Sequence, residues 1–359
     1  MPSFTINSDI LSATMDIISL VAFAEDIDSV TKANSKVGDD ILRIFRAAMA
    51  RSLSPIPYWN VPVIGQYIDG AGWARNRIVR SFTKLVNEYE SMLLANGDNN
   101  TKEAKSNTFL GKVFALSKKD NSKLSPERLV SNIVNMFGAG SETTFVTTCS
   151  CLYEIAIDRT GLQDELATEI MAFQNFDEAG LEESTEGLPR MRSLVYEVLR
   201  IKGPTPFLGL ENAEPFEIDG TVQPPSTFFI VLMQYISTLE SSEAGKRKPA
   251  GPRDAPLKDV CPRRWLEGGK GEKSDGNIDA PMVVSPTYKT GFRPFGTGVR
   301  VCPGRDLAEA EVLVILALIL SKFEISLEQG HPPMKLVSRF TESPDIDIRL
   351  VLKPRKVAK

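Results

Sequence analysis

The chain has 359 residues, 42% of them hydrophobic and 25% charged, and a formal net charge of -4 at pH 7. This composition is typical of a folded protein and lacks the basic surface that neutralises a phosphate backbone, so it argues against nucleic acid as a partner. The one histidine, His331, lies in a turn-rich stretch, which argues against zinc proteases, two-histidine iron sites and most hydrolase triads.

The sequence indicates neither a leader peptide nor a membrane span. The first ten residues lack the basic flank and apolar centre of a signal peptide, and no stretch reaches the roughly 18 apolar residues of a spanning helix. Four cysteines, Cys149, Cys151, Cys261 and Cys302, without a secretory signal favour a reducing compartment. The sequence therefore predicts a soluble or peripheral protein without a structural disulfide.

Apolar residues at helical spacing dominate the chain up to residue 200. Ser125, Pro126 and Glu127 form a strong helix start, because they supply an N-cap, a proline at the first helical position and an acid in the first turn. The pattern that follows continues past Leu152 and predicts the longest helix. The expected helices cover residues 8–24, 39–50, 71–96, 126 to beyond 152, 162–174 and 189–200.

Strand signals occur only later. Asp219 and Gly220 form a hairpin-turn signal, residues 226–237 are a dense apolar run, and alternate positions from 346 to 352 are apolar. Residues 243–281 are rich in proline, glycine and lysine, and we interpret them as an ordered meander. The sequence predicts a mainly α fold with small β-sheets late in the chain.

The stretch from Phe292 to Glu311 surrounds Cys302 with glycines, prolines and arginines and continues into an apolar helix. The sulfur is therefore expected at a helix N-terminus, where unpaired backbone N–H groups favour a thiolate. Lowering a thiol pKa by about three units takes roughly 4 kcal/mol, of which a helix end supplies about 1 to 2. With no histidine nearby, a bound metal is the simplest source of the remainder.

One thiolate does not hold a bare metal ion, but it can be the single protein ligand of an iron held by four macrocycle nitrogens, which indicates haem. In this interpretation Gly296 and Gly298 let backbone donors approach the sulfur and leave room for a flat ring, and Arg300 offers a cation to a propionate. The alternative is that Cys302 is an ordinary core residue beside an apolar helix.

Seven positions of this stretch are Phe295, Gly296, Gly298, Arg300, Cys302, Pro303 and Gly304. They resemble, position by position, the haem-ligand motif of the cytochrome P-450 family of haem-thiolate monooxygenases. The resemblance implies a helical fold of this family, with haem b (iron protoporphyrin IX) as the cofactor and Cys302 as the axial ligand of its iron. The other haem-binding positions that it implies in this loop are Phe295, Gly296, Arg300 and Gly304.

The long helix contains FGAGSETT, Phe137 to Thr144, whose two glycines each cost roughly 1 kcal/mol relative to alanine. Something is therefore expected close to that backbone. The stretch resembles the family's oxygen-binding motif, which implies that Ala139 and Gly140 border the space above the iron. In the same motif Glu142 would be the acid and Thr143 the hydroxyl that steadies bound dioxygen. Taken alone, these residues also fit a solvated glutamate and a threonine bonded back to the preceding turn.

Glu197 and Arg200 are three apart on one face of a predicted helix and can pair. On their own they would be an ordinary surface pair. They resemble the family's Glu-x-x-Arg pair, which joins an arginine of the meander, here Arg264 in the stretch Pro262 to Trp265. The resemblance implies a structural network that supports the cysteine loop without chemistry of its own. Relatives often carry an acid where this chain has Arg263.

The resemblance also implies a substrate pocket lined by Phe137, Phe207, Leu208 and Phe340. Residues 1–359 are expected to form one haem-thiolate monooxygenase domain that begins midway through the helical region and lacks the N-terminal part, because family members carry more residues before the oxygen-binding helix. Trp73 to Arg77, WARNR, matches the family's W-x-x-x-R propionate motif literally but lies too close to that helix.

The resemblance implies a haem-dependent monooxygenase of eukaryotic microsomal type that inserts one oxygen atom of O2 into an apolar small organic substrate. Electrons would come from a separate NADPH-dependent reductase, since the sequence offers no convincing flavin or nicotinamide motif. By resemblance, we expect a monomer at the cytosolic face of the endoplasmic reticulum membrane. Two alternatives stay open: a truncated, non-catalytic fragment with weak or no haem binding, and a helical interaction protein with a core cysteine.

Overall fold

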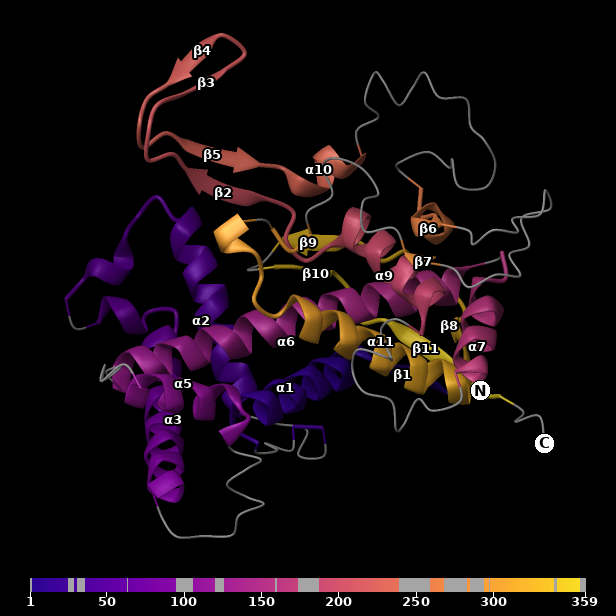
Figure 1. The fold of residues 1–359 in the computed structure, drawn as a ribbon, viewed down its shortest axis with the longest axis horizontal. Helices are drawn as coiled ribbons and strands as arrows, with labels where there is room; N and C mark the ends of the chain where they lie inside the picture. Colours follow the sequence, from indigo (N-terminus) through magenta and orange to yellow (C-terminus); the bar gives the residue numbers. More distant parts are fainter. Residues whose placement is uncertain are drawn as a thin grey trace. The chain divides into compact units, whose positions relative to one another are not determined.

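The computed structural model describes residues 2–24, 29–30, 36–62, 64–94, 106–119, 126–158, 160–173, 187–238, 259–267, 283–284, 294–296, 298–338 and 341–355 (Figure 1). The chain divides into two compact units. Unit 1 comprises residues 1–6, 146–337 and 341–359, and unit 2 comprises residues 7–145 and 338–340. The expectation of a single functional domain over residues 1–359 stays a prediction.

Helices make up most of the described chain. They are α1 (Asn7–Phe23), α2 (Lys36–Leu53), α3 (Ala71–Leu94), α5 (Phe109–Lys119), α6 (Pro126–Ile157), α7 (Leu162–Ala172), α9 (Pro189–Lys202), α10 (Met233–Thr238) and α11 (Arg305–Lys322), with 3-10 turns η1 (Tyr58–Asn60), η2 (Gly65–Tyr67), η4 (Pro262–Trp265) and η5 (Gly298–Arg300). All six helices expected before residue 203 are confirmed, and α6, at 32 residues, is the longest described. Within the described residues, no helix is both long and apolar enough to cross a bilayer.

The described strands are short. They are β1 (Ser3–Thr5), β2 (Leu208–Glu211), β3 (Phe216–Ile218), β4 (Thr221–Gln223), β5 (Phe228–Val231), β6 (Leu266–Glu267), β7 (Val283–Val284), β8 (Phe323–Leu327), β9 (Leu336–Ser338), β10 (Glu342–Pro344) and β11 (Arg349–Pro354). The expected mainly α fold with small sheets is confirmed.

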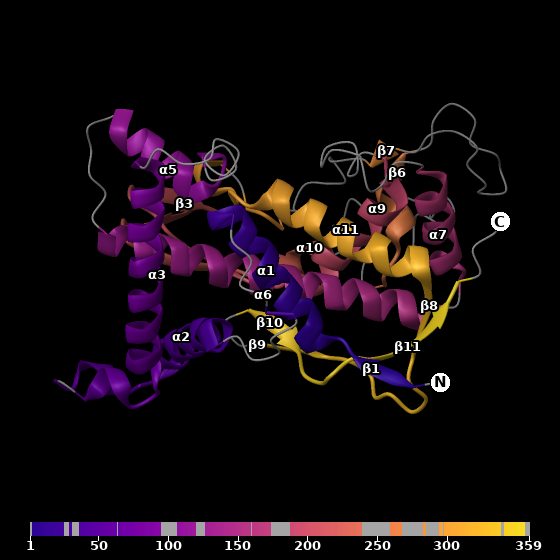
Figure 2. The same cartoon turned by 90° about the horizontal axis from the view of Figure 1, so that it is seen from below.

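The expectation that strands occur only late in the chain is wrong for β1. This strand pairs antiparallel with β11, Phe4 opposite Leu350, and β11 also pairs with β8 in a three-stranded sheet (Figure 2). Three residues are too few for an alternating pattern to show, and the partner strand lies at the other end of the chain. No local signal therefore predicts it.

The apolar run at residues 226–237 also differs from a simple strand. Its first part is β5, antiparallel to β2, and its second part is the short helix α10. The hairpin predicted at Asp219 and Gly220 is confirmed: it joins β3 to β4, and the two turn residues have φ of 48° and 77°. Two positive φ values are typical of the tight turn that suits the twist of a hairpin.

In unit 2, α6 packs closely against α1 and α2 through its two glycines. A Cβ on Gly138 would collide with the Phe45 ring of α2, and a Cβ on Gly140 would lie 2.9 Å from Ile18 Cδ1 of α1. The expectation that something lies close to this backbone is therefore met by neighbouring helices of the same unit. Glycine tolerates such an approach because it has no side chain.

Gly138→Ala is expected to lower the free energy of unfolding by roughly 2 kcal/mol, because relief of the collision with Phe45 must shift a ring or a helix. Gly140→Ala is the matched control. It meets only the flexible end of Ile18, and alanine gains about 1 kcal/mol of helix propensity, so little net change is expected. Urea unfolding of both variants measures the difference. Equal midpoints would contradict the packing assignment.

In unit 1, α9 is deeply buried, with every residue from 193 to 200 buried. Its N-cap residue, Leu188, has no side chain that could accept a hydrogen bond from the first turn of the helix. Glu169 of α7 supplies the acceptor instead. The two carboxylate oxygens of Glu169 accept from the backbone N of Arg190 at 2.7 Å and of Met191 at 3.0 Å. A carboxylate at a helix N-terminus satisfies unpaired N–H groups, so α7 fixes where α9 begins.

Candidate functional site

The cysteine loop of unit 1 ends at the start of α11. The backbone N of Cys302 donates to Phe295 O at 2.8 Å, which closes the loop on itself. Gly304 is the N-cap residue of α11, and a Cβ on it would lie 3.9 Å from Cys302 Sγ. The sulfur therefore lies at the N-terminal end of this helix, as the sequence predicted, and the side chain of Cys302 is exposed.

Two loop glycines adopt backbone conformations that disfavour other residues. Gly296 has φ of 73° and Gly298 has φ of 62°. Among the described residues, nothing lies within 4 Å of a Cβ built on Gly298, so space is open there, and the Arg300 side chain is exposed nearby in the chain. These residues fit a haem group: an exposed thiol at a helix N-terminus, with open space and a cation on the same loop.

A small pocket lies next to this loop within unit 1. Its lining residues include Gly296 of the loop, Arg200 of α9, Pro204, Leu208 of β2 and Met233 of α10. Leu208 thus shares a pocket with the cysteine loop, whereas neighbouring Phe207 is 44% exposed and does not line it. Their roles toward a substrate stay predictions.

The motif residues of α6 belong to unit 2. Thr143 Oγ1 donates to Ala139 O at 2.6 Å, the back-bond that a helical threonine ordinarily makes. Glu142 is only 4% exposed, so the alternative of a solvated glutamate is wrong. Phe137, expected in the substrate pocket, lies in an aromatic cluster with ring centroids 5.7 Å from Phe23 and 5.4 Å from Phe82. Its role in a pocket stays a prediction, and Phe340 lies outside the described residues.

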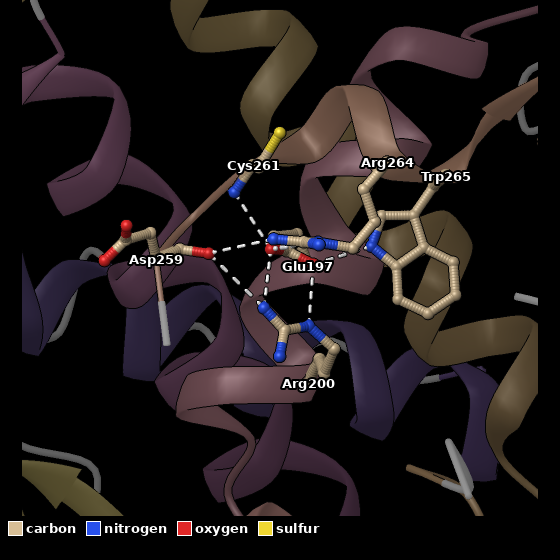
Figure 3. Close-up of polar contacts among 6 residues, drawn as sticks. All are labelled: Glu197, Arg200, Asp259, Cys261, Arg264 and Trp265. Carbon is tan, nitrogen blue, oxygen red and sulfur yellow. Dashed lines mark hydrogen bonds and ion pairs between the residues drawn. The ribbon is translucent and has the colours of Figure 1, made fainter. Parts of the chain in front are cut away.

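Glu197 is the centre of a buried network in unit 1 (Figure 3). Its Oε1 accepts from Arg200 Nη2 at 2.8 Å, Cys261 N at 2.9 Å and Arg264 Nε at 3.1 Å. Its Oε2 accepts from Arg200 Nε at 2.9 Å and Trp265 Nε1 at 2.8 Å. The structure therefore brings together the three residues Glu197, Arg200 and Arg264 that the sequence singled out. The surface-pair alternative is wrong, because Glu197 is fully buried.

Two positive charges hold this carboxylate ionised. Burial alone would raise the pKa of Glu197, but hydrogen bonds from Arg200 and the charges of Arg200 and Arg264 outweigh burial and hold the pKa below its usual value. The backbone O of Asp259 accepts from both guanidinium groups, at 3.4 and 3.3 Å (Figure 3). The network thereby ties α9 to the chain on either side of Cys261.

Sequence reasoning missed Trp265 as a member of this network. Its side chain is fully buried, and its only polar atom, Nε1, donates to Glu197. A buried indole N–H needs an acceptor, so a tryptophan directly after Arg264 was a usable signal. Arg263 stands at a position where relatives often carry an acidic residue. It lies outside the Glu197 network and pairs with Glu165 of α7.

A further buried carboxyl lies on α11. Glu311 is 6% exposed, and its Oε1 has no hydrogen-bond partner among the described residues. Burial raises the pKa of Glu311 to about 8. Between its unfolded pKa, about 4.3, and about 8, the folded protein keeps this proton while the unfolded chain releases it. The free energy of unfolding therefore falls as the pH rises through this window.

Glu311→Gln is expected to be more stable than the parent protein at pH 8 by roughly 4 kcal/mol, because the amide never ionises, and the advantage shrinks toward pH 5. Urea unfolding at both pH values measures this gap. Glu324→Gln is the control, since Glu324 is exposed and pairs with Lys353 of β11. If the difference in unfolding free energy between Glu311→Gln and the parent protein were equal at pH 5 and pH 8, Glu311 would be ionised in the folded state.

Comparison with known proteins gives one consistent family. A sequence model of cytochrome P-450 matches residues 2–240 and 261–347. Mitochondrial sterol 26-hydroxylase of Homo sapiens is 24% identical over 302 residues, 82% of this chain and 50% of the relative. The cytochrome P-450 monooxygenase ALT8 of Alternaria alternata is 22% identical over 345 residues, 90% of this chain and 57% of the relative.

A solved structure shares the fold. A crystal structure of a cytochrome P-450 matches with a TM-score of 0.73 and 18% identity, over 99% of this chain and 69% of that one. The chain spans about half the length of the curated relatives it matches.

Proposed function

We propose, from the premise that this chain belongs to the cytochrome P-450 family, that it is a haem-dependent monooxygenase in which Cys302 ligates the haem iron. Haem monooxygenase activity is general in this family. The observation that carries the proposal is the exposed thiol of Cys302 directly before the N-terminus of α11. Neutral thiols are poor ligands, and a helix N-terminus favours the thiolate that binds iron.

When bound, haem would supply activation of dioxygen and transfer of one oxygen atom to a substrate. The chain's own residues would hold and protect that group. Arg300 would pair with a propionate, and Gly296 and Gly298 would leave room for the ring beside the sulfur. We include two more residues in the same haem-binding loop. Phe295 closes the loop through its backbone O, and Gly304 is the N-cap residue of α11.

On α6, Glu142 would hold a proton and Thr143 would pass it on through its hydroxyl. The buried position of Glu142 supports an acid that exchanges protons without bulk water. Thr143 Oγ1 donates to Ala139 O at 2.6 Å, and a hydroxyl group can both donate and accept a proton. Ala139 and Gly140 would border the space above the ring.

We propose an apolar small organic substrate and electrons from a separate NADPH-dependent reductase, with the chain acting as a monomer. Two relatives support oxidation of organic carbon by their names, a sterol 26-hydroxylase and a fusicoccadiene 8-ol C-16 hydroxylase. The candidate substrate contacts are Phe137, Phe207, Leu208 and Phe340. The compartment proposed from resemblance is the endoplasmic reticulum membrane, whereas the human relative is named as mitochondrial, so organelle imaging decides between them.

A second candidate is a non-catalytic member of the same family with weak or no haem binding. In that case the cysteine loop and the Glu197 network would be present without a closed haem pocket.

One experiment separates the two. The chain is expressed with a haem precursor, purified, reduced and exposed to carbon monoxide. A strongly red-shifted Soret band, one haem per chain, is expected for thiolate ligation, and turnover with a reductase then tests the enzyme. Absence of any Soret band in the protein fraction, after incubation with excess hemin and removal of the unbound hemin, would exclude haem binding and leave the non-catalytic form.

A further inference from the structure

A second set of buried polar contacts joins α9 to α11. Tyr196 Oη donates to the carboxylate of Glu309, 3.1 Å from Oε1 and 3.2 Å from Oε2. Tyr196 and Glu309 are each 8% exposed. Arg192, one turn earlier on α9, places Nε 3.5 Å from Glu309 Oε2 and its guanidinium carbon 5.6 Å from the centre of the Tyr196 ring. A hydroxyl and a cation of α9 thus hold one carboxylate of α11.

This contact compensates for the cost of burying Glu309. Burial raises the pKa of Glu309, and the charge of Arg192 and the hydrogen bond from Tyr196 act against that shift. A buried carboxylate without donors is strongly destabilising, so the Tyr196 hydroxyl favours one position of α11 against α9 over any shifted one.

Tyr196 also contacts the Glu197 network. Its ring meets Trp265 edge to face, with centroids 5.6 Å apart and planes at 79°, and Trp265 Nε1 donates to Glu197. Neighbouring residues of α9 therefore serve two elements: Glu197 holds η4, and Tyr196 holds α11. Both elements are part of unit 1.

Among the described residues, few other polar contacts hold the start of α11. Its N-cap residue is Gly304, which has no side chain to cap the helix. Arg305 and Asp306 pair in the first turn, but both side chains are more than half exposed, and such pairs contribute little. Glu309, in the second turn, is the nearest position to Cys302 along α11 where a described buried polar contact reaches another element.

We propose that Tyr196 and Glu309 are positioning residues whose hydrogen bond, supported by Arg192, fixes the start of α11 against α9 and so holds Cys302 in the position that ligates haem. The inference rests on the proposed function, because it concerns ligation by this sulfur. Tyr196 and Glu309 act through α11 and take no part in a chemical step.

The first test uses the haem-free protein and hydrogen exchange of backbone amides. Tyr196→Phe keeps the ring against Trp265 and removes only the hydroxyl, and Glu309→Leu removes the acceptor at similar volume. Both are expected to speed exchange of residues 305–312 about tenfold, with the rest of unit 1 unchanged. Glu309→Gln keeps an acceptor and should restore slow exchange. Glu324→Gln, an exposed carboxylate of the same unit, is the control without effect.

The second test measures ligation. With equal haem bound per chain, Tyr196→Phe and Glu309→Leu should each lower the red-shifted fraction of the reduced, carbon monoxide-treated Soret band at least threefold, and Glu309→Gln should recover most of it. The double variant should be no worse than Glu309→Leu alone, because Glu309→Leu already removes the acceptor that Tyr196 and Arg192 share.

Unchanged exchange at residues 305–312, or a parent-like red-shifted fraction in both variants, would overturn the inference. Additive losses in the double variant would overturn it too. If the parent protein gives no red-shifted band, the proposed function itself fails. Local exchange at the start of α11 then still decides whether this contact orders the helix.

Discussion

Cys302→Ser is expected to abolish the red-shifted Soret band of the reduced, carbon monoxide-treated protein while leaving the fold nearly unchanged. The Cys302 side chain is exposed, so its sulfur makes little contribution to packing. The contact that closes the loop uses the backbone N of Cys302 and Phe295 O, and serine keeps it. We expect a change in unfolding free energy within about 0.5 kcal/mol, as for other surface substitutions, and complete loss of thiolate ligation.

Cys261→Ser is the matched control. Cys261 also belongs to unit 1, but it contributes to the Glu197 network through its backbone N, which serine preserves, and burial raises the pKa of its thiol. Its variant should keep the red-shifted band. Retention of that band in Cys302→Ser, or its loss in Cys261→Ser, would assign the iron ligand to a different side chain.

The cysteine loop was predictable because its signals are local. Glycines at 296 and 298 and the proline and glycine after Cys302 set backbone turns within a few residues, and the structure has positive φ at both of the first two glycines. The start of α11 follows from the same punctuation. A local pattern is sufficient where the conformation depends on neighbours in sequence.

The buried network was only partly predictable. The spacing of Glu197 and Arg200 predicts that they can meet on one helix face, and the structure confirms the contact, at 2.8 and 2.9 Å. Nothing local predicts that the same carboxylate also accepts from Arg264 and Trp265, which lie on η4. The contact with Arg264 was expected only from the family resemblance, and the contact with Trp265 was not expected at all.

The glycines of α6 show the opposite case, in which a correct local inference had an unforeseen cause. Two glycines inside a helix predicted a close neighbour, and the neighbours found in unit 2 are Phe45 and Ile18. Only Gly140 belongs both to this helix packing and to the pair, Ala139 and Gly140, that the likeness to an oxygen-binding motif singled out. Periodicity predicts which face of a helix is buried but not which residues pack against that face. The strand β1 was not expected for a related reason, because its partner β11 lies at the other end of the chain.

Glu197→Ala is expected to destabilise unit 1 by roughly 5 kcal/mol, since removing one partner of a buried ion pair leaves the other charges uncompensated. Arg200 and Arg264 are each 3% exposed and would lose their carboxylate, and the Trp265 indole would lose its acceptor. A loss of this size is comparable to the whole stability of many domains. Urea unfolding at pH 7 measures it, and far-ultraviolet circular dichroism reports whether the variant folds at all.

Two comparisons make the Glu197 prediction specific. Glu165→Ala removes the carboxylate that pairs with Arg263, both partners being about a third or more exposed, and should cost under about 1 kcal/mol of unfolding free energy.

Glu197→Gln keeps the shape of the side chain, so the variant should fold and allow its stability to be measured over a pH series. Because the folded pKa of Glu197 is lowered, its stabilisation is present above the unfolded pKa of about 4.3 and is lost as the pH falls through the folded value. The difference in unfolding free energy between the parent protein and Glu197→Gln should therefore become smaller as the pH is lowered below 4. A gap that widens instead, or a Glu197→Ala variant as stable as Glu165→Ala, would mean that the two arginines are held by other contacts and that Glu197 does not organise this part of the fold.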